Sequence, residues 1–360
     1  MKVLTIVGAR PQFVKAAMVS RAIVNHNAQN ETDKITEEII HTGQHYDPEM
    51  SDIFFEQMGI PEPAVNLEVG SGSHGAMTAK MLEGIEKEII ARKPDWLLVY
   101  GDTNSTLAGA LAASKLHVPV AHVEAGLRSY NKKMPEEINR ILTDHVSKLL
   151  LCPTESAVEN LHKEGLTDGV IHMGDVMYDA AKVFAEIAEE RSTILTDLEL
   201  KEGNYYLVTV HRAENTDFKE RLTSIFEGLA EVAKDAPVVY PVHPRTKKYI
   251  AEYGLEETCS ALKMIKPISF LDMVRLEKSA KAILTDSGGV QKEAYFHDVP
   301  CVTMRDETEW IETIEAGWNQ IVGADKTKII EAALKASKGS PISQYGEGKA
   351  AEKVVEALTK

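Results

Sequence analysis

Short apolar segments alternate with amphipathic helical segments along almost the whole chain of 360 residues. Short apolar runs bounded by glycine, proline or polar residues are typical of buried strands. Their alternation with helices predicts βαβ units, and therefore parallel sheets with helices on both faces. The strands predicted in the first half are Val3–Val7, Glu38–His41, Val65–Val69, Trp96–Tyr100, Val118–Val123 and Leu149–Cys152. Those predicted in the second half are Tyr205–Val210, Val238–Val242, Leu262–Ile265, Ala282–Thr285 and Cys301–Thr303.

The same pattern restarts after residue 175, which predicts two domains. A charged helix at Ala180–Arg191 suits a connector between them. We expect an N-terminal domain at 1–175 and a C-terminal domain at 176–349, with the last helix, 350–360, packing back on the first domain. The predicted fold class is α/β, with two Rossmann-type doubly wound domains facing a cleft. A short helix is also predicted at 48–58.

Charge and cysteine content restrict the classes of partner. The formal net charge of -15 opposes non-specific binding to nucleic acid or to an anionic membrane, so we expect neither as a partner. Cys152, Cys259 and Cys301 show no CxxC spacing and no paired pattern, which predicts reduced thiols. The first strand follows Met1-Lys2 directly, and no apolar run approaches the length of a membrane span. We therefore expect a cytoplasmic protein.

Acidic residues stand where two predicted strands end and where a helix begins. Asp102 follows Trp96–Tyr100, Glu124 follows Val118–Val123, and Glu136 opens a helix. Because ligands of open parallel sheets bind at the carboxyl ends of the strands, these carboxylates are expected to converge on one pocket. Crowded carboxylates can divide acid and base roles. Any one of them could instead cap a helix or pair with an arginine.

Two arginines are the expected partners in that second interpretation. Arg128 and Arg140 are placed to form ion pairs with Glu124 or Glu136. Glu137, beside Glu136, is interpreted as an acid that the helix dipole favours in the first turn.

A glycine-containing turn after a strand of the second domain suits a phosphate group. Ser287, Gly288 and Gly289 follow Ala282–Thr285 and open a helix, whose N-terminal N–H groups attract anions. Glu293 lies further along that helix, placed to accept hydrogen bonds from ribose hydroxyls. A plain N-cap with a glycine turn would look similar, and the motif lacks the lysine of a P-loop.

Basic residues and histidines follow other strands in the same way. Arg10 follows Val3–Val7 and is interpreted as a diphosphate ligand, while Lys15, one turn further on, is either a ligand or a surface charge. Gln44 and His45 follow the second strand. His211 follows the first strand of the second domain and can donate to an anion or move a proton. The spacing of these histidines is unlike a metal-binding motif, so no metal is expected.

Several ordered motifs resemble the non-hydrolysing UDP-N-acetylglucosamine 2-epimerases. The resemblance extends from Gly8 to about Trp310. The motifs are GARP at 8–11, GQH at 43–45, GDTNST at 101–106, HVEAGLRS at 122–129, PEEINR at 135–140, HRAEN at 211–215, TDSGGVQKEA at 285–294 and TMRDETEW at 303–310. The resemblance implies a GT-B-like fold that binds UDP in the cleft, mostly on the second domain.

The resemblance also implies a reaction that uses no NAD or other cofactor. The proton at carbon 2 of a UDP-2-acetamido sugar is removed while UDP leaves carbon 1, and re-addition to the 2-acetamidoglucal gives the other epimer. It implies Asp102, Glu124 and Glu136 as catalytic carboxylates, with His211 assisting at the diphosphate. The residues that it implies for binding substrate or UDP are Arg10, Lys15, Gln44, His45, Arg140, Ser287, Gly288, Gly289 and Glu293. A homodimer and a role in making surface polysaccharide precursors are implied as well.

Four positions depart from the commonest pattern of that family. Gln12 and Lys292 stand where glutamates are usual, and Ala213 and Trp310 stand where arginines are usual. These features resemble the branch that acts on UDP-2,3-diacetamido-2,3-dideoxy-glucuronate. The loss of two glutamates favours binding of a substrate with an extra carboxylate, whereas the loss of two arginines opposes it. The charge argument therefore does not decide between UDP-N-acetylglucosamine and the uronate as substrate.

Functions of other classes fit the same fold. A GT-B glycosyltransferase would bind the same nucleotide sugar, but it has no need of three proton-moving carboxylates. A hydrolysing epimerase, or a UDP-sugar sensor without catalysis, fits the motifs less well.

Overall fold

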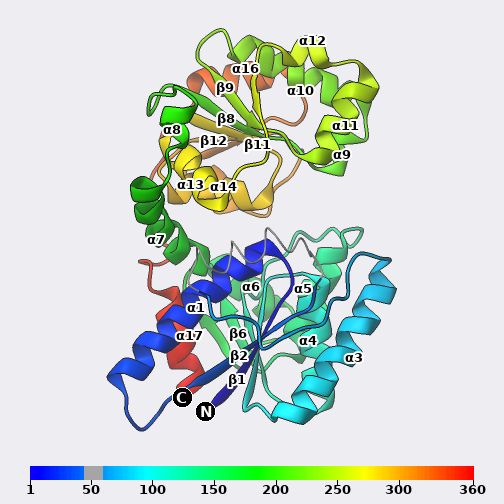
Figure 1. Ribbon diagram of the computed structural model, residues 1–360, viewed down its shortest axis with the longest axis vertical. Coiled ribbons are helices and arrows are strands. Elements are labelled where there is room, and N and C mark those ends of the chain that lie inside the picture. Colours follow the sequence, from blue (N-terminus) through cyan, green and yellow to red (C-terminus); the bar gives the residue numbers. More distant parts are fainter. Residues whose placement is uncertain (44–59) are drawn as a thin grey trace. The chain divides into compact units, whose positions relative to one another are not determined.

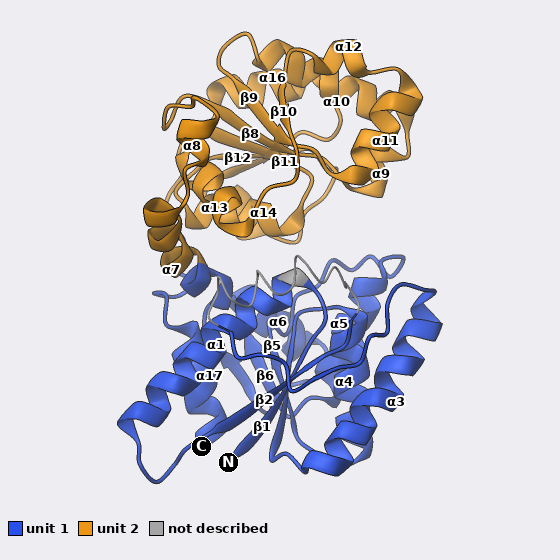
Figure 2. Ribbon diagram, viewed as in Figure 1, with its two compact units in different colours: residues 1–180, 343–360 blue, residues 181–342 orange. Residues whose placement is uncertain are grey.

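The computed structural model describes residues 1–43 and 60–360 of the chain, without the side chain of Arg10. The helix predicted at 48–58, together with Gln44 and His45, lies outside the described residues. The described part forms two compact units, shown in Figure 2. Unit 1 comprises residues 1–180 and 343–360, and unit 2 comprises residues 181–342.

The described strands of unit 1 form one parallel sheet in the order β3-β2-β1-β4-β5-β6-β7 (Figure 1). They are β1 (Lys2–Val7), β2 (Thr36–His41), β3 (Val65–Asn66), β4 (Trp96–Tyr100), β5 (Val120–Val123), β6 (Leu149–Cys152) and β7 (Val170–His172). The central strands are apolar on both sides because helices cover both faces of the sheet. The order reverses between β1 and β4, so this is the point of the sheet where a ligand site is expected.

Helices cover the two faces of this sheet. The helices α3 and α4 pack together, as do α4 and α5, while α17 lies beside α1 (Figure 1). The bounds are α1 (Arg10–Gln29), α3 (His74–Arg92), α4 (Asn104–Lys115), α5 (Pro135–Val146), α6 (Glu155–Lys163) and α17 (Ala350–Thr359). Apolar side chains of α3 and α4 meet those of β1 and β4 in one core cluster. The loops that carry the polar motifs lie at the carboxyl ends of the strands.

Unit 2 repeats this architecture with a parallel sheet in the order β10-β9-β8-β11-β12-β13. Its strands are β8 (Tyr206–Thr209), β9 (Val238–Pro241), β10 (Lys263–Ile265), β11 (Ala282–Thr285), β12 (Cys301–Thr303) and β13 (Asn319–Ile321). Its helices are α8 (Ile194–Asp197), α9 (Ala213–Thr216), α10 (Lys219–Val232), α11 (Pro244–Tyr253), α12 (Glu256–Cys259), α13 (Phe270–Ser279), α14 (Gly288–Phe296), α15 (Ile311–Glu315) and α16 (Lys326–Lys335). The order reverses between β8 and β11. The prediction of two doubly wound α/β sheets is confirmed.

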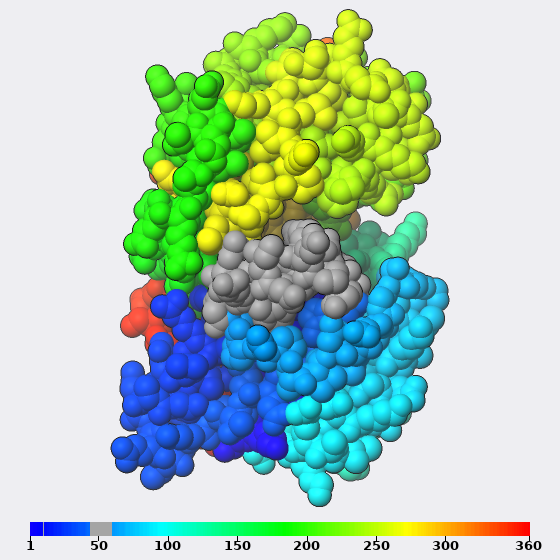
Figure 3. All heavy atoms as spheres, in the orientation of Figure 1, coloured from blue at the N-terminus to red at the C-terminus, as the bar shows by residue number. Residues whose placement is uncertain are grey.

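A connector helix, α7 (Val176–Arg191), belongs to unit 1 at its start and to unit 2 from Ala181 onward. The boundary expected from sequence, near residue 175, precedes this helix, whereas the units divide within it. In the space-filling view the green helices α7 and α8 lie at the surface (Figure 3). Asp179, in the first turns of α7, accepts a hydrogen bond at 2.7 Å from the backbone N–H of Ala351. It thereby caps α17, which has no cap from its own N-cap side chain.

The sequence analysis does not predict the two edge strands β7 and β13. Each of β7 and β13 has three residues and includes polar ones, His172 in β7 and Asn319 and Gln320 in β13, so neither gives an apolar run of strand length. The three cysteines are buried and free. Among the described helices, no stretch is both long and apolar enough to cross a bilayer.

Asp179 makes the stability of unit 1 depend on pH. Burial raises the pKa of its carboxyl from 3.8 to about 6. A raised carboxyl pKa means that folding favours the protonated form, so the stabilisation is complete below pH 3.8 and is lost as the pH rises through 6. Between pH 5 and pH 8 the wild type should lose about 1–2 kcal/mol of unfolding free energy relative to Asp179→Asn, which keeps the acceptor oxygen. Urea unfolding at both pH values measures this, with the exposed Asp168→Asn as control. Parallel pH dependence of wild type and Asp179→Asn would contradict the assignment.

Candidate active site

Asp102 lies where β4 ends, beside the reversal of strand order in unit 1. Its carboxylate accepts a hydrogen bond at 2.7 Å from the guanidinium of Arg140 on α5. Its backbone carbonyl accepts another, at 2.9 Å, from the side chain of Asn139. Successive residues of α5 therefore hold both the main chain and the side chain of Asp102.

Glu124 lies where β5 ends and has an unusual backbone conformation. Its φ of 72° is in the left-handed region, which is uncommon for a residue other than glycine. Such strain collects at functional sites, where the surrounding structure maintains it. The carboxylate of Glu124 lies 2.7 Å from the ammonium of Lys15 on α1, and both side chains are largely buried. The structure thus brings Lys15 into the site as a partner of Glu124 and excludes the surface-charge interpretation.

Glu136 and Glu137 stand side by side in the first turn of α5 but have different surroundings. Glu136 is half-buried and makes no hydrogen bond or ion pair with another described residue. Glu137 is fully buried and accepts the backbone N–H groups of Ser129 and Tyr130 and the guanidinium of Arg140. Burial opposes its ionisation, but these three hydrogen bonds lower the pKa of Glu137 below its ordinary value.

The arginine pairings expected from sequence are wrong. Arg140 pairs with Asp102 and Glu137, not with Glu124 or Glu136. Arg128 pairs with two other acids, Asp144 and Glu164. Helical spacing alone does not decide between Glu136 and Glu137, because side chains at i, i+3 and at i, i+4 both share a helix face. Arg140 and Glu137 are both buried, whereas Glu136 is half-buried.

Gln12 is buried and connects two loops, a role that the sequence analysis did not predict. Its Oε1 accepts the backbone N–H groups of Gly8 and Ala9, at 2.8 and 3.1 Å. Its Nε2 donates to the carbonyl of Tyr100 and to the hydroxyl of Thr106, both at 2.9 Å. An amide uses both of its ends here, so Gln12 joins the loop after β1 to the end of β4.

Asp286 organises the corresponding edge of unit 2. Its buried carboxylate accepts the backbone N–H groups of His211 and Arg212, each at 3.0 Å, and the side-chain amide of Asn215. The ring of His211 lies 3.5 Å from the same carboxylate and 5.5 Å from the ring of His243, centre to centre. Burial lowers the pKa of His211 despite the charge of Asp286, with Arg212 and His243 adding to the decrease, so the ring is neutral at neutral pH.

The loop after β11 is shaped for a close approach to its helix terminus. Ser287 is the N-cap of α14 but makes no side-chain capping bond, so its hydroxyl is available to a ligand. A Cβ on Gly288 would collide with the carboxylate of Glu309. The indole N–H of Trp310 donates to the carbonyl of Gly288 at 2.9 Å. Gly289 completes the first turn, and its backbone N–H is among the unpaired donors of a helix start.

Two departures from the family pattern contact each other in this loop. The ammonium of Lys292 lies 4.0 Å from the centre of the Trp310 ring, and both side chains are buried. The two residues thus form a cation–π contact. Ala213, another departure, is exposed in α9.

Glu293 lies in the second turn of α14, half-buried. Burial, followed by the charge of Glu293, raises the pKa of Glu277 well above its ordinary range. Burial lowers the pKa of the adjacent His297 to about 4. For Arg10 the structure gives only the backbone, at the first position of α1.

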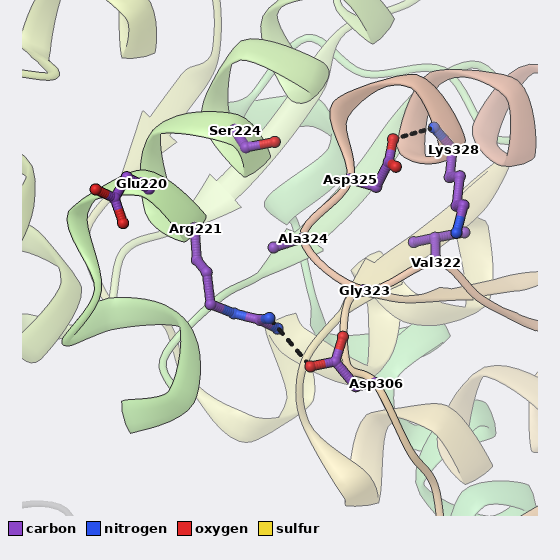
Figure 4. A pocket seen from close by; sticks show the side chains of 9 residues that line it. All are labelled: Glu220, Arg221, Ser224, Asp306, Val322, Gly323, Ala324, Asp325 and Lys328. Atoms are coloured by element: carbon purple, nitrogen blue, oxygen red, sulfur yellow. Dashed lines mark hydrogen bonds and ion pairs between the residues drawn. The ribbon is translucent and has the colours of Figure 1, made fainter.

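A surface hollow of about 410 Å³ lies elsewhere on unit 2 (Figure 4). Arg221 of α10 points across it to Asp306, with 3.0 Å between guanidinium and carboxylate. The residues that line it are Glu220, Arg221, Ser224, Asp306, Val322, Gly323, Ala324, Asp325 and Lys328. The predicted site residues of unit 2 line the strand ends and not this hollow. In residues 1–43 and 60–360, no three His, Cys, Asp or Glu side chains are grouped to hold a metal ion.

Comparison with known proteins gives consistent matches over both units. A family profile described as UDP-N-acetylglucosamine 2-epimerase matches residues 27–359. The chain is 52% identical to a UDP-N-acetylglucosamine 2-epimerase homolog of Methanococcus maripaludis, over 99% of both chains. It is also 52% identical to the UDP-2,3-diacetamido-2,3-dideoxy-D-glucuronate 2-epimerase of Pseudomonas aeruginosa, over 100% of both. A crystal structure of Methanocaldococcus jannaschii UDP-GlcNAc 2-epimerase with UDP-GlcNAc and UDP has a TM-score of 0.89 and 45% identity, covering 100% of this chain and 99% of that chain.

Gln12→Glu tests the connection between β1 and β4. The new carboxylate would place an oxygen against the carbonyl of Tyr100, which should cost about 1–3 kcal/mol of unfolding free energy at pH 8. A protonated glutamic acid can donate to that carbonyl, so the loss should be smaller at pH 5. Urea unfolding at the two pH values measures both effects, and Gln29→Glu at the exposed end of α1 is the control. Equal stability of Gln12→Glu and wild type at pH 8 would show that the amide donor is dispensable.

Proposed function

The chain belongs to the UDP-N-acetylglucosamine 2-epimerase family, and we propose that it inverts carbon 2 of a UDP-2-acetamido sugar. A base removes the carbon 2 proton, the electrons of that bond form a double bond to carbon 1, and UDP leaves carbon 1 with the electrons of the C–O bond. The resulting 2-acetamidoglucal takes a proton on its opposite face while UDP returns to carbon 1. The reaction consumes no oxidant, no reductant and no water.

The observation that carries this proposal is the placement of Asp102 and Glu124 where the neighbouring strands β4 and β5 end, with Glu136 in the first turn of α5, the helix whose Arg140 binds Asp102. Removing a proton from a carbon that is barely acidic needs a base, and the reverse step on the other face needs an acid. Three carboxyl groups supply both roles. A glycosyltransferase, which transfers the sugar without touching the carbon 2 proton, has no use for them.

The surroundings of the carboxyl groups suggest how the roles divide. The half-buried side chain of Glu136 forms no ion pair within the described residues, so we assign it direct proton exchange with the substrate. Glu124 lies against Lys15, and Asp102 lies against Arg140, each at 2.7 Å. When Glu124 accepts a proton, Lys15 is left without its carboxylate in a largely buried site, which favours the departure of an anionic leaving group. Arg140 keeps Glu137 as a partner when Asp102 is protonated.

Groups of unit 2 fit the UDP half of the substrate. The start of α14 offers backbone N–H groups and the Ser287 hydroxyl to a diphosphate. His211, neutral and held by Asp286, can donate a further hydrogen bond to it. Glu293, half-buried in the second turn of α14, is the proposed acceptor for the ribose hydroxyls.

UDP-N-acetylglucosamine is the proposed substrate and UDP-N-acetylmannosamine the product, a precursor for surface polysaccharide. The same chemistry on UDP-2,3-diacetamido-2,3-dideoxy-glucuronate is the second candidate, because the relative from Pseudomonas aeruginosa bears that name at 52% identity. We place the enzyme in the cytoplasm as a homodimer, as the resemblance implies.

Proton NMR in deuterated water tests the reaction and the substrate together. Incubation with UDP-N-acetylglucosamine should give the manno epimer with deuterium at carbon 2 and UDP still attached. Glu124→Gln should abolish turnover and deuterium incorporation while its affinity for UDP stays within a few-fold. Absence of turnover with wild type would direct the same assay to the uronate. If both sugars stay protonated at carbon 2 although UDP binds, the epimerase proposal fails and the glycosyltransferase becomes the leading alternative.

Titration calorimetry with UDP tests the ribose assignment. Glu293→Ala should weaken UDP binding by about 1–3 kcal/mol, the usual loss for a hydrogen bond to a charged group. Glu256→Ala, an exposed change on α12 of the same unit, is the matched control. If both variants bind UDP like the wild type, Glu293 does not hold the ribose.

A further inference from the structure

His122 is a fully buried histidine inside a strand that is otherwise apolar. It lies on β5, two residues before Glu124, and its side chain has no exposed surface. Its Nε2 lies 2.7 Å from the carbonyl oxygen of Gly101, and its Nδ1 lies 2.7 Å from the carboxylate of Asp144. A carbonyl and a carboxylate both accept hydrogen bonds, so the ring donates from both nitrogens.

Asp144 extends this contact to two further groups. Its second oxygen accepts the backbone N–H of Gly126 at 3.1 Å and the guanidinium of Arg128 at 2.7 Å. Burial opposes its ionisation, but the hydrogen bond and charge of His122, followed by Arg128, lower the pKa of Asp144. Gly126 has a φ of 82°, and a Cβ there would collide with the carbonyl of Ala157, so the turn after Glu124 needs glycine.

The pair formed by His122 and Asp144 touches every element that carries a catalytic carboxyl group. Gly101, whose carbonyl His122 holds, directly precedes Asp102. His122 itself and Gly126 flank Glu124 on the chain. Asp144 lies on α5, which begins with Glu136.

We infer that His122 is a positioning residue, which acts with Asp144 to hold the three carboxyl groups at fixed distances from one another. This inference rests on the proposed epimerase function. Proton transfer to and from carbon 2 demands such fixed distances, because a misplacement of about 1 Å can cost about 100-fold in rate.

Stability alone is a poor explanation for these buried charges. Replacing a buried ion pair by well-packed apolar residues is often neutral or stabilising. The neighbouring positions of β5 are apolar and equally buried. The better explanation for a polar residue at this one position of β5 is that His122 and Asp144 fix the Gly101 carbonyl and the turn at Gly126.

Three variants separate positioning from folding. His122→Phe fills the space but donates nothing, so kcat for deuterium incorporation at carbon 2 should fall about 100-fold while KM and UDP affinity stay within about threefold. Asp144→Asn can keep every hydrogen bond, because its amide donates to His122 while its oxygen accepts from Gly126 and Arg128. Its kcat should stay within about fivefold of wild type although its ion pair with Arg128 is lost. Thr143→Val, a buried change beside Asp144 whose hydroxyl has no partner among the described residues, is the control.

The pattern of kcat against melting temperature decides the outcome. If His122 acts by positioning, Asp144→Asn should have a lower melting temperature than wild type but a kcat within about fivefold of it. His122→Phe should have a much lower kcat and an unchanged KM. If kcat follows melting temperature across all variants, or if His122→Phe has wild-type kcat, the inference is wrong. If His122→Phe does not fold, Asp144→Leu, which leaves the Nδ1 proton of His122 and the Gly126 N–H without acceptors, takes its place with the same expectation.

A spectrum that needs no substrate keeps this test independent of the proposed function. Nitrogen-15 NMR of histidine-labelled protein should show protons on both ring nitrogens of His122 in wild type and on one in Asp144→Asn. An unprotonated ring nitrogen in wild type would overturn the hydrogen-bond network. If the spectrum is as expected but neither UDP-sugar turns over, the proposed function has failed and not the network.

Discussion

Carboxylates crowd the carboxyl ends of β4 and β5, and the cations placed among them make that arrangement possible. Lys15, Arg128 and Arg140 are each 6–7% exposed, and each lies 2.7 Å from a carboxylate of this edge. An unpaired charge in such a place costs several kcal/mol, so the acids could not gather without them. These cations come from α1, from the loop after β5 and from α5. The packing of three elements against one sheet is thus a condition for the chemistry as well as for the fold.

Unit 2 also contains a buried carboxylate, but N–H dipoles stabilise it in place of positively charged side chains. The buried Asp286 is held by backbone N–H groups and by the amide of Asn215. His211 beside it stays neutral at neutral pH because of its burial. The carboxylate of Asp286 accepts its hydrogen bonds from His211, Arg212 and Asn215, so none of these bonds uses an N–H group of the α14 start. This is the edge that we propose binds the diphosphate, whereas unit 1 carries the proposed proton-moving carboxyl groups.

The sequence predicts the long strands and the acids after them because a parallel sheet brings all carboxyl ends to one edge. That rule alone is enough to predict that Asp102 and Glu124 lie at the same edge of the sheet. The partners of Arg140 needed the orientation of α5, which no spacing of single residues reveals. Gln12, Lys292 and Trp310 looked like lost charges when set against the family pattern. In three dimensions each has its own contacts, which sequence cannot supply because the residues of each contact come from separate elements. The strands β7 and β13 were missed because each is short and partly polar.

Unit 1 is discontinuous along the chain, and this has a consequence for its synthesis. Residues 343–360, including the α17 helix that packs beside α1, are translated only after all of unit 2. While the ribosome is still making unit 2, the apolar side of α1 lacks its final cover, and Asp179 lacks the helix end that it caps. Unit 2 is built from one continuous stretch and can complete its sheet during that interval. We therefore expect unit 2 to reach its native fold first and unit 1, which carries the proposed catalytic carboxyl groups, to complete its fold last.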